Sequence, residues 1–399
     1  MYTPEGDRIL DFNSQLMSVN IGHGDRRVID AINEQVTKLQ YVQPAFATEV
    51  RARLGAKLAE ILPGDMDKVF FTLGGAEAIE NAIKLARHVT GRHKVLARYR
   101  AYHGATLGAM TLTGDPRRWA NEPGIVGVVR YPDTHRWGEA EPRPVAESLQ
   151  GLEDVIRYEG AHTIAAIFLE TIVGTNGILI PPDGYLKGVR ELCDRYDILM
   201  VADEVMAGFG RTGRWFAVDH WDVVPDIITT AKGINSGYVP LGAMTVRPWL
   251  YERIADRVFA GGLTYSGHPL ACAVAVASVE AFREEGIVEQ AAAQGSYLGE
   301  ALPALAERHP SIGDVRGLGL FWGLELVANR ETREPLAPFN GSSEAMTRLS
   351  KAALERGLYL FVHWNVVVVC PPLTITREEL DEGLAVLDEV LAIADEYVV

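Results

Sequence analysis

The chain is poor in cysteine and in basic runs. It contains three cysteines, Cys193, Cys272 and Cys370, which lie far apart in apolar segments and therefore predict neither a disulfide framework nor a metal site. Lys and Arg number 38 against 53 Asp and Glu, and the net charge of −15 argues against a nucleic-acid partner. The chain shows neither an apolar run of membrane length nor a secretory signal, so we expect a soluble, cytoplasmic protein without a membrane partner.

Hydrophobic residues make up 48% of the chain and charged residues 23%, which is typical of a globular protein with a substantial core. Short apolar runs alternate with helical patterns, such as the helix expected over 76–89 with Gly91 as its end. This alternation predicts βαβ units and a mostly parallel sheet. The expected strands cover residues 69–73, 95–97, 164–169, 198–202, 227–230 and 241–246.

The rest of the chain predicts a second, smaller unit. Helices are expected at 270–285, 297–307, 344–356 and 377–397, with strands at 315–326, 358–362 and 366–370, and a strand at 9–12 and a helix at 27–39 are expected to join them. The prediction is thus an α/β fold with a large domain at residues 39–276 and a small α+β domain built from residues 1–38 and 277–399. The stretch 115–144, rich in Pro, Arg and Trp, is expected to be an irregular loop.

Two of the expected buried strands end next to ionisable residues. The run ILMVADEVMAGFGR at 198–211 places Asp203 at a strand end, and DIITT at 226–230 is followed by Ala231 and Lys232. Ligands of open α/β sheets bind beyond the carboxyl ends of the strands. Alone, the aspartate would most often cap a turn and the lysine would be a solvated charge. Together they indicate a site, because a desolvated lysine has a lowered pKa and can form an imine.

A lysine that forms a Schiff base with pyridoxal phosphate needs three further groups: an acid for the pyridine nitrogen, a nest for the phosphate and a side chain against the ring. Asp203 can supply the acid. Gly74 and Gly75, between a strand and a helix in TLGGAE, can supply the nest, although any tight turn there favours glycine. Tyr102 can stack on the ring, and Val205 can close its other face.

Seven sequence blocks carry a resemblance to a known family. They are LGGAEA, YHGAT, LETIVGTNG, ADEVMAGFGRTG, TTAKGINSGYVPLGA, GLTYSGHP and PPLTIT. In their order and spacing they resemble the class III (omega-type) pyridoxal-phosphate aminotransferases of fold type I. SQLMSVNIGHG and AVDHW are most similar to taurine–pyruvate and omega-amine–pyruvate aminotransferases. The resemblance implies transfer of an amino group from a primary amine or omega-amino acid to a 2-oxo acid, expected to be pyruvate, in two ping-pong half-reactions.

The resemblance also implies roles for individual residues. Lys232 is expected to carry the cofactor and to move the proton, and Asp203 is expected to pair with the pyridinium. The other expected cofactor contacts are Gly75, Ala76, Tyr102, His103, Glu170, Val205, Met206 and, from a second subunit, Thr264. A homodimer with shared active sites, or a tetramer, is therefore implied. The residues expected around the substrate are Leu16, Met17, Phe361 and His363.

The chain departs from the family mainly around the substrate. Phe361 and Val368 stand where two branches of the family carry an arginine, and Thr175 stands where the glutamate partner of the second arginine is found. This double absence argues against a 2-oxoglutarate enzyme of that design. The substrate anion then needs another partner, and the candidates are His363, Asn365 or an arginine of the 115–143 region. Ala76 replaces a frequent Ser or Thr, so one phosphate hydrogen bond is lost.

Four alternatives use the same cofactor or the same fold class. An aminomutase or a decarboxylating aminotransferase would need the same cofactor residues, so these residues do not separate them from the main prediction. A non-catalytic protein that binds pyridoxal phosphate would have little reason to keep Lys232 together with Asp203. A nucleotide-binding α/β protein is disfavoured, because RGLGLFWG at 316–323 lacks the third glycine of the dinucleotide fingerprint.

Overall fold

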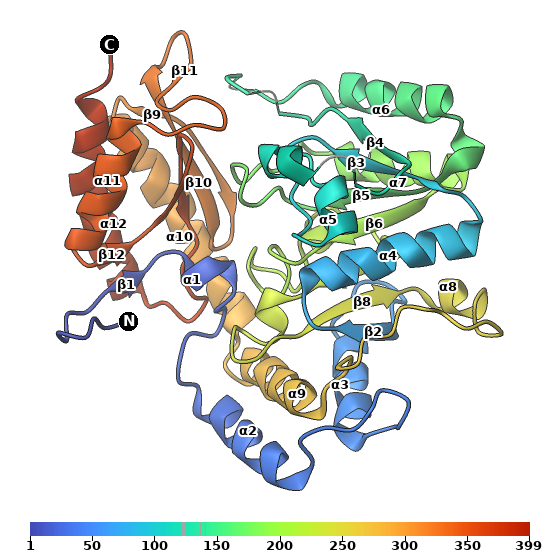
Figure 1. Cartoon of the computed structure of the whole chain (residues 1–399). Coiled ribbons are helices and arrows are strands. Elements are labelled where there is room, and N and C mark those ends of the chain that lie inside the picture. Colours follow the sequence, from blue (N-terminus) through green and yellow to red (C-terminus); the bar gives the residue numbers. More distant parts are fainter. Residues whose placement is uncertain (122–123, 136, 140) are drawn as a thin grey trace.

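The structure is a computed structural model, and it describes residues 1–121, 124–135, 137–139 and 141–399. Two sheets with their helices lie side by side (Figure 1). The strands of the larger sheet are β2 (Lys68–Thr72), β3 (Lys94–Arg98), β4 (Val128–Tyr131), β5 (Ile164–Glu170), β6 (Leu199–Asp203), β7 (Ile227–Thr230) and β8 (Gly242–Val246). The first helices of the chain and those around this sheet are α1 (Ser14–Met17), α2 (Arg26–Lys38), α3 (Glu49–Ala59), α4 (Gly75–Thr90), α5 (Leu107–Leu112), α6 (Val145–Glu159), α7 (Tyr185–Tyr196), α8 (Pro248–Glu252) and α9 (Pro269–Glu284).

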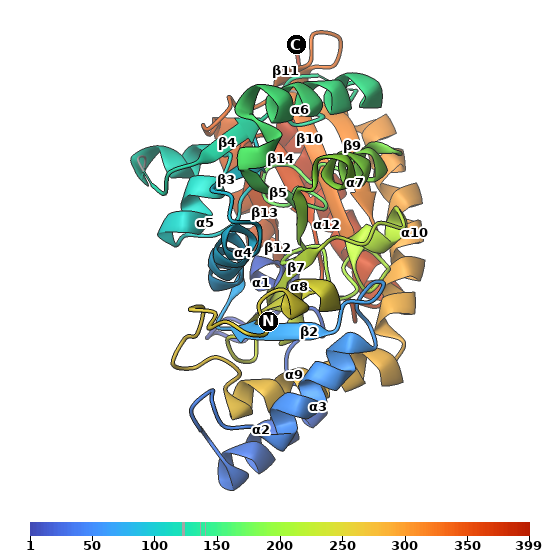
Figure 2. The ribbon, with the colours of Figure 1, turned by 90° about the vertical axis from the view of Figure 1, so that its right-hand side faces the viewer.

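The larger sheet is mostly parallel, which confirms the predicted fold class. Its strand order is β2-β8-β7-β6-β5-β3-β4, and β8 runs antiparallel to both of its neighbours. The buried strand β5 contributes side chains to the hydrophobic clusters on both faces of the sheet. Phe168 packs in the cluster under α4, and Ile167 and Leu169 pack in the cluster under α7. Figure 2 places α4 and α5 on one side of β5 and α7 on the other.

The second sheet is built from the C-terminal part of the chain. Its strands are β9 (Ile312–Leu318), β10 (Phe321–Asn329), β11 (Glu334–Pro335), β13 (Phe361–His363) and β14 (Val366–Val369). The helices of this part are α10 (Ile287–Arg308), α11 (Glu344–Glu355) and α12 (Arg377–Asp395). Figure 1 shows α11 and α12 beside this sheet, on the side away from the larger sheet. A capping box formed by Thr376 and Glu379 starts α12 where the sequence predicts a helix.

The first residues of the chain reach both parts of the molecule. β1 (Leu10–Asp11) pairs in parallel with β12 (Leu358–Tyr359), beside the second sheet, whereas α2 packs against α9. The domain limits at residues 39 and 276 remain a prediction. In the described part of the chain, no helix has the length and apolar composition needed to cross a membrane.

Two predictions need correction, and a third is made more specific. The 115–144 stretch is not irregular throughout, because residues 128–131 form β4, the edge strand beside β3. The helix expected at 297–307 is the second half of α10, which begins at Ile287 and contains Gly295, Gly299 and Pro303, residues that weaken the helical signal. The strands expected at 315–326 are present as the hairpin of β9 and β10, which turns at Gly319 with a φ of 57°.

Candidate active site

Three neighbouring strands deliver polar groups to one edge of the larger sheet. The register places Glu170 of β5 opposite Asp203 of β6, and Asp203 opposite Thr229 of β7. Lys232 follows the end of β7 after one further residue. These groups border a cavity of about 590 Å³. The predicted site residues that line it are Leu16, Met17, Gly75, Ala76, Tyr102, His103, Glu170, Asp203, Val205, Met206, Lys232 and Phe361.

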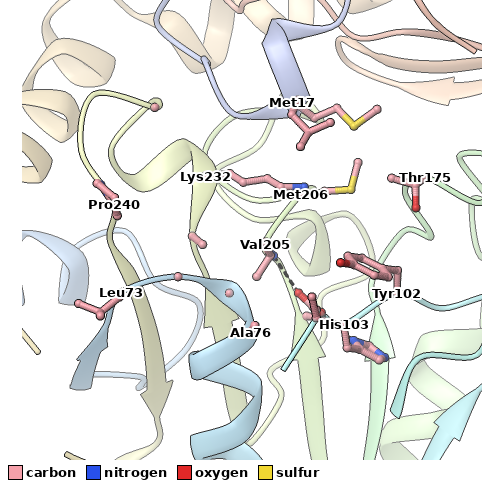
Figure 3. Close-up of a pocket in the computed structure, with 18 of the residues that line it drawn as sticks. Met17, Leu73, Ala76, Tyr102, His103, Thr175, Val205, Met206, Lys232 and Pro240 are labelled. Carbon is pink, nitrogen blue, oxygen red and sulfur yellow. Dashed lines mark hydrogen bonds and ion pairs between the residues drawn. The ribbon is translucent and has the colours of Figure 1, made fainter. Parts of the chain in front are cut away.

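Lys232 projects into this cavity. Figure 3 shows Met17 on one side of its side chain and Val205 on the other. Its backbone has a φ of 46°, a left-handed conformation that costs energy for a residue with a side chain. Burial lowers the pKa of Lys232 to about 8, although the negative charges of Asp203 and Glu170 oppose this shift. At pH 7 about a tenth of the amine is therefore neutral and nucleophilic, far more than for a lysine with an ordinary pKa.

Asp203 is held by two hydrogen bonds at the end of β6. Its Oδ1 accepts from the N–H of Val205 at 3.0 Å, and its Oδ2 lies 2.7 Å from Nδ1 of His103. The imidazole of His103 is buried, and the backbone N–H of His103 donates to Oγ1 of Thr113 at 3.1 Å. The carboxylate is thus fixed in direction while it still borders the cavity.

Glu170 fixes the loop that follows β3. Its Oε1 accepts from the N–H of Tyr102 at 2.8 Å, and its Oε2 accepts from the N–H of Gly174 at 2.9 Å. Burial raises the pKa of Glu170 to about 7, and nearby Asp203 raises it further while His103 opposes the shift. The carboxylates at the ends of β5 and β6 therefore hold neighbouring residues of the same loop, because Glu170 binds Tyr102 and Asp203 contacts His103.

The start of α4 forms one wall of the cavity. Gly74, Gly75 and Ala76 line it, so the free N–H groups of the first turn of this 16-residue helix lie at the cavity. A Cβ added to Gly75 would lie 2.9 Å from Cγ2 of Val205, and one added to Gly104 would lie 2.6 Å from Cβ of Ala76. Both glycines are thus required by close packing. A helix start of this kind attracts an anion such as a phosphate.

Comparison with known proteins shows the family to which the chain belongs. Residues 1–391 match the family described as aminotransferase class-III. This chain belongs to the class III aminotransferases. It is 42% identical to taurine:2-oxoglutarate aminotransferase from Bifidobacterium kashiwanohense, solved with PLP and glutamate, with a TM-score of 0.96 over 99% of this chain and 91% of that one.

Two curated relatives extend the comparison. The omega-aminotransferase of Caulobacter vibrioides is 34% identical over 98% of this chain and 91% of its own length. The taurine–pyruvate aminotransferase of Bilophila wadsworthia is 32% identical over 98% of this chain and 92% of its own length. The chain is therefore an omega-transaminase-like class III aminotransferase of fold type I, and its cofactor is pyridoxal 5'-phosphate (PLP).

The cavity residues of this class III aminotransferase fit that cofactor. Lys232 offers an amine, Asp203 offers a fixed carboxylate, and the start of α4 offers N–H groups for a phosphate. Gly75 and Gly104 permit a close approach to Val205 and to Ala76, respectively, which a side chain at either position would prevent. Amine, acid and anion nest border one cavity, as the sequence predicts, and the individual roles remain proposals.

Two predicted site residues do not line the cavity. Thr264 is exposed, and its carbonyl accepts from the hydroxyl of Tyr41 at 2.8 Å, so its predicted role requires a second subunit. His363 stacks between Phe361 and Trp364, with ring centroids 5.8 and 4.4 Å away. Burial, and then the charge of Arg117, lower the pKa of His363 to about 4. The imidazole is therefore neutral at neutral pH and is a poor partner for an anion.

The structure also distinguishes between the other candidates for the substrate anion. Asn365 is fully buried and donates to the carbonyl of Leu326 at 2.8 Å, away from the cavity lining. Arg117 of the 115–143 region does line the cavity. Sequence could not single it out among the arginines of that region, because its position depends on how the loop folds against Tyr102. Arg136 of the same region lies outside the described residues.

Proposed function

We propose that this class III aminotransferase moves the amino group of a primary amine or omega-amino acid to pyruvate. The observation that carries the proposal is that Lys232, Asp203 and the start of α4 border one cavity. Pyruvate is favoured because Val368 and Thr175 stand where the arginine and the glutamate of a 2-oxoglutarate site of that design are expected. The relatives do not decide the acceptor, since one is named for 2-oxoglutarate and another for pyruvate.

When bound, PLP supplies an electron sink that stabilises negative charge on the substrate carbon. Lys232 then serves as the base and acid that takes a proton from one carbon and returns it to another, which suits a group with a pKa of about 8. Asp203 keeps the ring nitrogen protonated, and His103 keeps the carboxylate of Asp203 in place. One face of Tyr102 is covered by Arg117, which leaves the other face for the cofactor ring.

The half-reactions test this proposal directly. We expect an amine donor alone to remove the visible absorbance of the holoenzyme in one stoichiometric turnover, and pyruvate alone to restore it. Taurine, beta-alanine and an aryl-alkyl amine are the donors to compare. Restoration by 2-oxoglutarate as fast as by pyruvate would contradict the acceptor assignment only. Isomerisation or carbon dioxide release from a single substrate would instead support the aminomutase or the decarboxylating alternative.

The proposed phosphate site gives a second test, at Gly75. We expect Gly75→Ala to weaken PLP binding by about tenfold, because overpacking against the stiff Val205 side chain costs about 1–3 kcal/mol. Cofactor affinity can be measured by calorimetry on the cofactor-free protein. Val205→Ala is the matched partner, because it removes the methyl groups that the new Cβ would meet.

If the clash is the cause, adding Gly75→Ala to Val205→Ala should weaken PLP binding much less than Gly75→Ala weakens it in the wild-type protein. Equal losses in the two backgrounds would show that the glycine matters for another reason. Unchanged affinity in Gly75→Ala itself would remove the start of α4 from the proposed phosphate site.

A further inference from the structure

The guanidinium of Arg117 is held on three sides within the cavity. Its centre lies 3.7 Å from the centroid of the Tyr102 ring. Its Nη2 donates to Oγ1 of Thr175 at 2.8 Å, and its Nε donates to Oδ2 of Asp115 at 2.7 Å. A side chain fixed in this way loses little conformational entropy when it binds a ligand.

The support behind Arg117 is itself rigid. Asp115 is 1% exposed, its Oδ1 accepts from the backbone N–H of Arg117 at 2.9 Å, and its Oδ2 accepts from Nδ2 of Asn176 at 3.1 Å. Nη2 of Arg117 also donates to Asp115. These contacts use Nε and Nη2, whereas Nη1 has no hydrogen-bond partner among the residues that the structure describes. The side chain of Arg117 is 38% exposed and lines the cavity, so the guanidinium is open to a ligand.

The other basic side chains that line the cavity already have roles. Of the described lining residues, Lys232, His103 and Arg117 are basic. Lys232 is proposed to carry the cofactor, and His103 is bound to Asp203. His363, behind Phe361, is neutral at neutral pH, partly because Arg117 is charged. Arg117 is therefore the cation left to face an anionic substrate.

We propose that Arg117 is the fixed anion-binding group of the substrate site, and that it binds a carboxylate or sulfonate through Nη1. The inference rests on the proposed function, because it assumes that amine and oxo acid enter this cavity. Thr175 acts as a positioning residue, since its hydroxyl holds Nη2. The anion has two sources, the carboxylate of the oxo acid and the acid group of an omega-amino acid donor.

Separate half-reactions of the holoenzyme test the role of Arg117. With an aryl-alkyl amine, which has no acid group, we expect Arg117→Met to react within about twofold of wild type, since no anion contact is lost. With pyruvate we expect KM to rise about 10- to 100-fold, because a hydrogen bond to a charged group is lost. Arg117→Lys should restore part of the loss. Comparison of beta-alanine with taurine shows whether a donor's acid group uses the same contact.

Two further variants and one binding measurement complete the test. Arg118→Met is the matched control. Arg118 follows Arg117 on a short 3₁₀ helix (Pro116–Asn121), but its guanidinium lies over the ring of Tyr99 and it does not line the cavity, so the kinetics of the variant should stay unchanged. Thr175→Val should raise KM for pyruvate by a smaller factor than Arg117→Met. Propionate, a non-reactive carboxylate, should bind wild type in competition with pyruvate and should bind Arg117→Met more weakly, as calorimetry would show.

The proposal is overturned if Arg117→Met slows the neutral amine as much as pyruvate, since the residue would then be structural. It is also overturned if both KM for pyruvate and propionate binding are unchanged. Failure of the proposed function gives a different result, because no amine would then convert the wild-type holoenzyme. The propionate measurement still reports on Arg117 in that case.

Discussion

Replacing Lys232 with alanine is expected to reduce transamination by more than about 10³-fold, because proton transfer by a positioned group is worth about 10²–10⁴ and the covalent route is lost as well. The measurement is the single-turnover rate with an aryl-alkyl amine. The variant should also fail to retain PLP covalently after reduction with borohydride, which mass spectrometry detects. The loss should reflect chemistry and not folding, because the substitution removes an amine whose burial costs free energy in the native state, while alanine can keep the same backbone conformation as the lysine.

Lys351→Ala is the matched control for Lys232. Its side chain is 77% exposed on α11 and, within the described ranges, pairs only with Glu355, so its loss should leave the rate unchanged. A small primary amine added to Lys232→Ala should restore part of the proton transfer, since it can occupy the space of the missing group. A variant that kept more than about a tenth of the wild-type rate would show that another base does this work.

The sequence could predict the residues at the strand ends because their signals are local. Short apolar runs identify β5, β6 and β7 as buried strands, and a parallel arrangement brings their carboxyl ends to one edge. The glycines before α4 are visible for the same reason. The resemblance then adds roles for Tyr102, His103 and Glu170, which the structure places around the cavity.

The rest depends on contacts between distant segments. β4 has four residues in a stretch dominated by Pro, Arg and Trp, and its pairing with β3 defines it more than its own pattern does. The position of Arg117 depends on its contacts with Thr175 and Tyr102. Thr175 lies far along the chain, after β5, and Tyr102 lies in the loop that follows β3. The sequence offers His363 as one candidate partner for the substrate anion, but its imidazole stacks against Phe361 and Trp364 and does not line the cavity. None of these contacts follows from spacing along the chain.

Replacing Asp203 with asparagine is expected to slow both half-reactions by about 10²–10³-fold, because removing one partner of a buried charge pair costs about 3–5 kcal/mol. The change keeps the shape of the side chain, and Oδ1 can still accept from the N–H of Val205. It removes the charge that would keep the cofactor nitrogen protonated, so PLP affinity should fall too. Calorimetry and single-turnover rates measure the two effects.

The contact of Asp203 with His103 adds a cost to the same substitution. The new side-chain amide would donate to Nδ1 of His103, which moves the imidazole proton to Nε2, a buried atom that has no hydrogen-bond partner in the part of the chain that the structure describes. An unpaired buried donor costs about 1–3 kcal/mol, so the free energy of unfolding should fall by that amount.

Asp226→Asn separates stability from chemistry. Asp226 is buried at the start of β7, where its Oδ2 accepts from Arg190 and from the N–H of Met200, both at 2.8 Å, and it does not line the cavity. Its replacement should lower stability while the single-turnover rate stays near wild type. If Asp203→Asn lost stability but kept its rate within about threefold, its carboxylate would serve the fold, and the acid for the cofactor ring would have to be another group.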